Sequence, residues 1–144
     1  MAYTYKYPRP AVTVDILAFK NRGKKAEVLL IQRKHDPFKD KWAFPGGFIE
    51  MDETLEEAAR RELKEETNLV AKNLHQFRAY DDPDRDPRGR TISMVFYTFI
   101  TDSSPSARAA DDAKNAAWYP IENLPELAFD HDQIITDAIE EIID

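Results

Sequence analysis

Residues 46–69, which read GGFIEMDETLEEAARRELKEETNL, decide how the rest of the chain is interpreted. Thr54 stands three residues before Glu57, a spacing that is typical of a capping box at the start of a helix. Apolar residues then recur at helical spacing as far as Thr67. The sequence therefore predicts a helix from about Thr54 to Thr67.

One face of this predicted helix changes from apolar to acidic along its length. Seven residues fall on one stripe at about 100° per residue. The apolar part of the stripe consists of Leu55, Ala58, Ala59 and Leu63, and the acidic part of Glu62, Glu65 and Glu66. Because this stripe should face a sheet, an ordinary amphipathic helix would not place three carboxylates on it.

The three carboxylates need a positive partner, because negative charge near a helix C-terminus opposes the helix dipole. The residues four positions after Glu65 and Glu66 are Leu69 and Val70, so ion pairs within the helix cannot supply it. Clustered carboxylate oxygens are typical ligands of Mg²⁺ or Mn²⁺, and either ion keeps water for a phosphate substrate. The alternative is a solvated, Glu-rich helix end without a ligand.

Two adjacent glycines precede the helix. Gly46 and Gly47 are expected where the backbone takes unusual angles or approaches a ligand closely, and a carbonyl here can join a metal site. In isolation, the ordinary interpretation of this pair is a tight turn.

The remaining elements indicate a mixed α/β domain with a sheet between helices. Strands are predicted at Val12–Phe19, Glu27–Arg33, Thr91–Ile100 and Ala116–Tyr119, and the first two should form a hairpin. A second amphipathic helix is predicted over His131–Ile143, with Asp130 as its N-cap and an apolar stripe of Ile134, Ile135, Ala138, Ile139 and Ile142. The polar segments Asp81–Arg90 and Asp102–Asp112 are predicted as loops outside the core.

Composition excludes several classes of protein. The 144 residues, 42% of them hydrophobic, are enough for one domain spanning 1–144. A net charge of −7 is not typical of a nucleic-acid-binding surface. No apolar run is long enough to span a membrane, and Lys6, Pro8 and Arg9 interrupt any signal peptide. The absence of cysteine excludes disulfides and is compatible with the cytoplasm, which is the location we expect.

The spacing of the glycines, the loop glutamate and the acidic helix end in residues 46–69 resembles the Nudix box. That pattern runs Gly, five residues, Glu, seven residues, then Arg-Glu, an aliphatic residue, one residue, Glu-Glu, one residue, Gly and an aliphatic residue. Gly47, Glu53 and the segment 61–69 match it except at the final glycine, where this chain has Asn68. Asn is the next best residue for a left-handed helix cap, so the turn should survive.

The resemblance implies an α/β/α sandwich and a role for each matching residue. It implies that Glu62, Glu65 and Glu66 bind a divalent metal together with the Gly46 carbonyl. Arg61 matches a residue that pairs with Glu53 to brace the loop against the helix. We group Arg61 with Glu62 and Glu65 as the catalytic set, and Glu53 and Asn68 as structural support. Either Glu62 or Glu65 is expected to be the base, with Asp112 as an alternative.

A narrower likeness lies outside the box. There the chain is similar to the ADP-ribose pyrophosphatase subgroup and to Nudix-like sensor domains of bacterial transcription regulators. The segments that carry it are 10–15, 84–90, 111–113 with Trp118, and 127–131. The expected substrate is ADP-ribose, cleaved to AMP and ribose 5-phosphate. A non-catalytic ligand sensor and a Nudix hydrolase of another nucleotide are the alternatives.

Four residues are expected to bind the substrate. Arg85 and Arg88 can pair with phosphate oxygens in forked geometry, or Asp84 and Asp86 can brace them within their loop. Arg33 is a further phosphate candidate. Phe129 is expected either to stack on a base or to cap the core.

Some expectations remain for the rest of the chain. His131, at the start of the second helix, is expected to be structural rather than catalytic. Asp111 and Asp112 can orient water or metal, or lie in a solvated loop. As partners we expect a small nucleotide and a second copy of the chain in a homodimer, with neither nucleic acid nor membrane.

Overall fold

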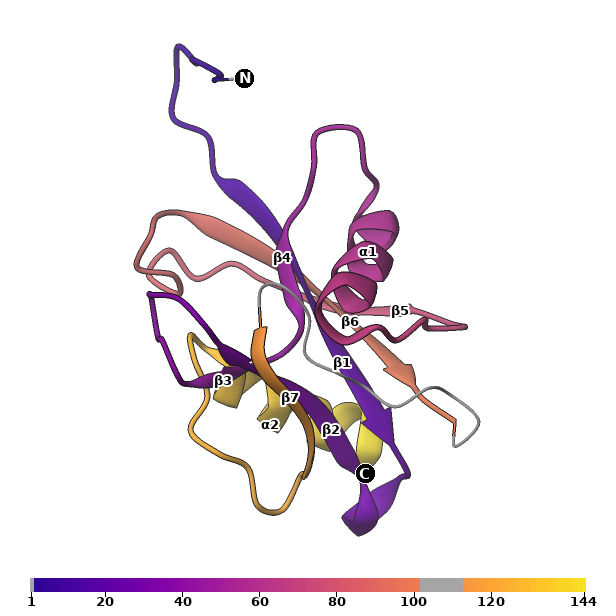
Figure 1. Cartoon of the computed structure of the whole chain (residues 1–144). Coiled ribbons are helices and arrows are strands. Elements are labelled where there is room, and N and C mark those ends of the chain that lie inside the picture. The colour runs from indigo at the N-terminus through magenta and orange to yellow at the C-terminus, as the bar shows by residue number, and fades with distance from the viewer. Residues whose placement is uncertain (1, 102–112) are drawn as a thin grey trace.

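The computed structural model describes residues 2–101 and 113–144, and within them a mixed sheet is packed between two helices (Figure 1). In chain order the elements are β1 (Ala11–Lys20), a 3-10 turn (Gly23–Lys25), β2 (Glu27–Arg33), β3 (Trp42–Ala43), β4 (Gly46–Phe48), α1 (Leu55–Thr67), β5 (His75–Tyr80), β6 (Thr91–Phe99), β7 (Ala113–Pro120), α2 (His131–Ala138) and a π turn (Ile139–Ile143). Neither helix in these residues has the length and apolar character needed to cross a membrane.

The sheet order is β3-β2-β1-β6-β5, with β7 paired to β2 and β4 paired to β1. β1 and β6 run parallel along their whole length, from Ala11 opposite Thr91 to Phe19 opposite Phe99. The other edge of β1 is shared by two antiparallel strands. Residues 13–15 pair with β4, and residues 19–20 pair with β2. The sheet therefore divides along this edge of β1.

Alternating side chains of β1 separate two apolar cores. Val14 and Ile16 pack with Leu63 of α1, whereas Leu17 packs with Ile134 of α2. Because successive strand side chains point to opposite faces, α1 and α2 cover opposite sides of the sheet (Figure 1). The three-layer α/β/α arrangement that the sequence predicts is confirmed.

The local signals of the first helix are confirmed. Thr54 accepts a hydrogen bond from the Glu57 backbone N–H, and the Glu57 side chain accepts one from the Thr54 N–H, which completes the capping box. At the other end Asn68 adopts a left-handed conformation, with φ 64° and ψ 7°. These features depend only on residues within the helix and its caps.

Three short or polar strands were not predicted: β3, β4 and β5. β3 and β4 have two and three residues, too few for a pattern to register. β5 reads HQFRAY and is an edge strand whose side chains are exposed or half-buried, so it lacks the apolar signal of a buried strand. The predicted hairpin of β1 and β2 is present.

The second helix differs from its prediction at both ends. Asp130 occupies the N-cap position but makes no side-chain cap hydrogen bond, because its carboxylate binds Arg85 instead. After Ala138 the chain widens into a π turn, in which the Asp144 N–H bonds to the Ile139 carbonyl. The wider turn shifts the apolar stripe, so Ile143 is buried while Ile142 is only half-buried.

The loop at 81–90 is also less exposed than predicted. Arg85 and Asp86 are buried, because Arg85 pairs with Asp130 and Asp86 with Arg88. The second predicted loop, Asp102–Asp112, lies outside the described residues, as do Asp111 and Asp112.

Candidate active site

A cavity of about 550 Å³ lies where the sheet divides beside β1. Strand residues of β1, β2 and β4 form its floor, and α1, the loop at 81–90 and the start of α2 form its walls. Eight of the candidate metal and substrate-binding residues named from the sequence line it, and Asp111 and Asp112 lie outside the described residues. The eight are Arg33, Gly46, Glu62, Glu65, Glu66, Arg85, Arg88 and Phe129.

The two glycines belong to a strand, so their interpretation as a tight turn is wrong. A Cβ at Gly47 would lie 2.8 Å from the Cδ of Glu62, and a Cβ at Gly46 would lie 2.2 Å from the Val14 carbonyl oxygen. Neither glycine has a positive φ. Gly46 is required because the β1 backbone lies too close for any side chain, whereas a side chain at Gly47 would displace the carboxylate of Glu62.

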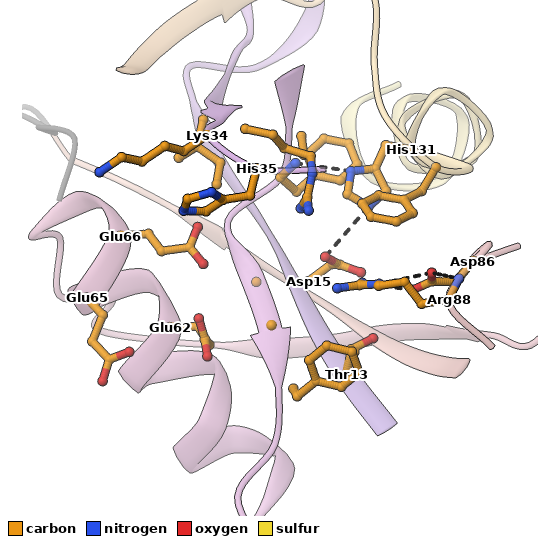
Figure 2. A pocket seen from close by; sticks show the side chains of 18 of the residues that line it. Thr13, Asp15, Lys34, His35, Glu62, Glu65, Glu66, Asp86, Arg88 and His131 are labelled. Carbon is orange, nitrogen blue, oxygen red and sulfur yellow. Dashed lines mark hydrogen bonds and ion pairs between the residues drawn. The ribbon is translucent and has the colours of Figure 1, made fainter. Parts of the chain in front are cut away.

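The three carboxylates of α1 do not share one environment. Glu62 and Glu66 are buried and point toward β4, whereas the Glu65 side chain is 53% exposed (Figure 2). The prediction that all three share the buried stripe is therefore correct for Glu62 and Glu66 and wrong for Glu65. Glu65 lies at the edge of the stripe, where a long side chain reaches solvent.

Arg61 connects these carboxylates to the preceding loop. Its guanidinium makes two hydrogen bonds to Glu53, of 2.6 and 2.8 Å, and further bonds of 2.8 Å to Glu62 and 3.2 Å to Glu65. It also donates to the Phe48 carbonyl. The hydrogen bonds from Arg61 lower the pKa of Glu53 to about 2, and the pKa of Arg61 is raised in turn, first by its bonds to Glu53.

Glu66 is a buried carboxylate whose surroundings do not compensate its negative charge. Its Oε2 atom is buried and, in the described part of the chain, has no hydrogen-bond partner. Burial raises the pKa of Glu66 well above its ordinary value, and the hydrogen bond and charge of Glu62 raise it further. The Gly46 backbone N–H compensates only in part. A buried carboxylate oxygen beside a second carboxylate is a favourable site for a cation.

The residues present fit a hard divalent ion through this oxygen rather than through a preformed cage. Within 2–101 and 113–144, no three His, Asp or Glu side chains converge closely enough to surround an ion. Glu62 and Glu65 are instead held by Arg61. The donor set consists of oxygen only, which is the chemistry that Mg²⁺ and Mn²⁺ prefer.

On the opposite wall, arginine guanidinium groups lie over the faces of phenylalanine rings. The Arg88 guanidinium carbon lies 4.8 Å from the ring centre of Phe48 and 5.4 Å from that of Phe129, while Asp86 binds the same guanidinium. Arg33 lies 5.0 Å from the Phe129 ring and donates to the Pro37 carbonyl. Burial, together with the charge of Arg88, lowers the pKa of Arg33. Arg88 is thus braced by Asp86, one of the two arrangements considered from the sequence.

Arg85 has a different partner from those considered. Its side chain is 4% exposed and donates to both oxygens of Asp130, at 2.9 and 2.7 Å. Asp130 is 45 residues further along the chain, so sequence spacing could not identify this pair.

Sequence reasoning missed a buried polar chain beneath the cavity. Asp15 accepts a 2.5 Å hydrogen bond from the Ser93 hydroxyl. Its other oxygen lies 3.6 Å from His131 Nε2 (Figure 2). His131 Nδ1 accepts the Phe44 backbone N–H at 3.1 Å. One signal was present in the sequence: an Asp in the middle of the apolar strand VTVDILAF. This arrangement agrees with the structural role expected for His131.

Comparison with known proteins decides the family. A family model described as NUDIX domain matches residues 9–138. The chain belongs to the Nudix family. Its box departs from the family pattern only at Asn68, whose left-handed conformation keeps the turn that the final glycine would make.

Three proteins similar to this chain are informative. An ADP-ribose pyrophosphatase from Methanocaldococcus jannaschii is 48% identical over 131 residues, which cover 91% of this chain and 74% of that protein. The NUDIX domain of Shewanella oneidensis NrtR, solved with ADP ribose, superposes with a TM-score of 0.85 at 30% identity and covers 97% of this chain and 94% of that one.

The third relative is a bifunctional NMN adenylyltransferase/ADP ribose pyrophosphatase from Francisella tularensis, solved with AMP and a manganese ion. It superposes with a TM-score of 0.81 at 40% identity over 95% of this chain. This chain covers 43% of that protein.

Proposed function

We propose that this Nudix domain is a pyrophosphohydrolase that cleaves ADP-ribose to AMP and ribose 5-phosphate in the presence of Mg²⁺ or Mn²⁺. The observation that carries the proposal is the buried Glu66 Oε2, which has no hydrogen-bond partner among the described residues, in a cavity whose opposite wall holds Arg33 and Arg88. Carboxylates on one wall and guanidinium groups on the other suit a metal-bound pyrophosphate.

The same residues suggest how the substrate is held. Glu62, Glu65, Glu66 and the Gly46 carbonyl would hold the metal. When bound, it would offset the charge of the pyrophosphate and lower the pKa of an attacking water. Arg88 would exchange its bonds to Asp86 for phosphate oxygens, and Phe129 would offer a ring face to the base.

In the hydrolysis step, the water oxygen forms a bond to one phosphorus atom while the bridging P–O bond breaks. The bridging oxygen leaves on the other phosphate, and the water proton passes to a carboxylate. Glu62 and Glu65 are the candidates for this base in the described part of the chain. Both already bind Arg61, which would hold either carboxylate in position during the transfer.

The likeness to the NrtR domain favours a second function, in which the domain binds ADP-ribose without cleaving it. One experiment separates the two. The protein is incubated with Mg²⁺ and a panel of ADP-ribose, other sugar nucleotides, dinucleotides and nucleoside triphosphates, and kcat/KM is measured for each. We expect the highest kcat/KM for ADP-ribose. Tight binding of ADP-ribose without turnover would support the sensor, and preference for a triphosphate would refute the substrate assignment.

The homodimer, the cytoplasmic location, the absence of a nucleic-acid partner and the single domain over 1–144 stay predictions. Sedimentation or light scattering would test the first of these directly.

A further inference from the structure

β4 is a thin partition between two polar clusters. On one side Glu62 and Glu66 approach it from α1, and on the other side Asp15 and His131 lie beneath it (Figure 2). The partition is thin because Gly46 and Gly47 have no side chains. A Cβ on Gly46 would lie 2.6 Å from Asp15 Oδ1, so the Asp15 carboxylate lies directly against the Gly46 backbone.

The strand pairing directs the backbone N–H and carbonyl of Gly46 away from β1 and toward the cavity. Asp15 is opposite Gly46 in the antiparallel register, and the flanking hydrogen bonds run from the Ile16 N–H to the Pro45 carbonyl and from the Ile49 N–H to the Val12 carbonyl. In such a ladder the bonds alternate, so Asp15 and Gly46 form a pair without backbone hydrogen bonds to each other. The Gly46 N–H is accordingly free to bond to Glu66.

His131 holds the other end of this segment. Its Nδ1 accepts the Phe44 N–H at 3.1 Å, two residues before Gly46, and its ring stacks on the Phe44 ring at 4.7 Å between centres. An imidazole that accepts at Nδ1 carries its proton on Nε2. His131 Nε2 lies 3.6 Å from Asp15 Oδ1, while Asp15 Oδ2 accepts the hydrogen bond of the Ser93 hydroxyl.

Burying these polar side chains costs free energy of desolvation. Asp15 is 8% exposed, His131 2% and Ser93 0%, so all three polar side chains are buried. Apolar residues of similar volume are often as stabilising as buried ionic groups, or more so. The arrangement instead determines which imidazole nitrogen is free to accept, and therefore where the Phe44 N–H is held.

We infer that His131, oriented by Asp15, is a positioning residue for the reaction: through the Phe44 N–H it fixes the strand that presents the Gly46 peptide to Glu66. The inference rests on the proposed function, because it assigns to this strand the placement of the metal-binding groups. His131 touches neither substrate nor metal in this role.

Two substitutions at His131 separate positioning from simple packing. His131→Asn keeps an acceptor oxygen near the position of Nδ1, whereas His131→Phe keeps the ring and its stacking but has no acceptor. His75→Phe is the matched control, because His75 is an exposed histidine on edge strand β5 that also packs against an aromatic ring, that of Tyr97. For each protein we would measure Mn²⁺ affinity by calorimetry without substrate, then kcat, KM and thermal unfolding without metal.

We expect His131→Phe to bind Mn²⁺ about 10-fold more weakly than the parent. Its kcat should fall while its KM stays close to that of the parent, which is the usual result of removing a residue that orients metal ligands. His131→Asn should recover most of both losses, and His75→Phe should behave like the parent. Unchanged Mn²⁺ affinity and kcat in His131→Phe would overturn the inference. So would equal losses in the Asn and Phe variants.

A third measurement keeps the inference testable if His131→Phe does not fold. Nitrogen-15 NMR of the parent should show the His131 proton on Nε2, and a proton on Nδ1 would overturn the inference. The proposed metal site is tested separately. If the parent does not bind Mn²⁺, or if Glu66→Gln binds it as well as the parent, the proposed function fails whatever His131 does.

Discussion

Arg85 donates hydrogen bonds of 2.9 and 2.7 Å to the two carboxylate oxygens of Asp130 and thereby ties the loop at 81–90 to the first turn of α2. Because Asp130 is followed by His131, the same contact holds the segment that supports the floor of the cavity. Arg85 also lines the cavity, but its guanidinium is already engaged in this pair. Removing the Arg85 side chain should therefore mainly lower the free energy of unfolding.

We expect Arg85→Ala to lower the free energy of unfolding by about 2 kcal/mol, the scale of a lost charged hydrogen-bonded pair. Urea unfolding measures this loss. Asp130→Ala should cost a similar amount, and the double variant should cost clearly less than the sum of the two. Additive losses would show that the two side chains do not act as a pair.

Arg88 should affect substrate binding, because its side chain is 40% exposed and lines the cavity opposite the carboxylates of α1. Arg88→Ala should raise the KM for ADP-ribose about 10-fold or more with little change in kcat. Arg78→Ala is a suitable control, since Arg78 is 41% exposed and pairs with carboxylates outside the cavity. Equal KM values in the Arg88 and Arg78 variants would remove Arg88 from the substrate site.

Glu66→Gln should reduce metal-dependent kcat on the order of 100-fold, since it removes a charge from the proposed metal site. The same change should raise the melting temperature of the metal-free protein, because it relieves the burial of a carboxylate beside Glu62. Glu56→Gln, on the exposed face of α1, is the control. Parent-like turnover of Glu66→Gln at saturating metal and substrate would show that α1 is not the metal site.

The Glu53–Arg61 pair should make stability depend on acidity. The pKa of Glu53 is lowered from 4.5 to about 2, so in this range the unfolded chain binds more protons than the folded one. The stabilisation is therefore fully present above about pH 4.5 and lost as the pH falls toward 2. Urea unfolding of the parent and of Glu53→Gln should converge over this range. A difference that stays constant over this pH range would contradict the prediction.

Asn68 should tolerate glycine and reject β-branched residues. Its φ of 64° is open to glycine at no steric cost, whereas valine there is strained by about 1–2 kcal/mol. Thermal unfolding should show Asn68→Gly close to the parent and Asn68→Val clearly less stable. Equal stability of the two variants would mean that the helix end rearranges.

The amino-acid sequence alone determined the features that depend on neighbours along the chain. The Thr54–Glu57 capping box, the left-handed Asn68 cap and the acidic end of α1 all follow from interactions between residues at most four positions apart. The spacing of Gly47, Glu53 and the segment 61–69 was sufficient to identify the family, because the pattern is fixed by distances along the chain.

The tertiary structure decided which distant groups meet. Arg85 finds Asp130 across 45 residues, Ser93 finds Asp15 across 78, and His131 finds the Phe44 N–H across 87. The geometry of the sheet and of its two helical layers sets these contacts, and no local periodicity encodes them. For the same reason Gly46 and Gly47 resembled a turn in sequence but form a strand: what requires glycine there is the close approach of β1 and of Glu62, which only the folded chain brings to them.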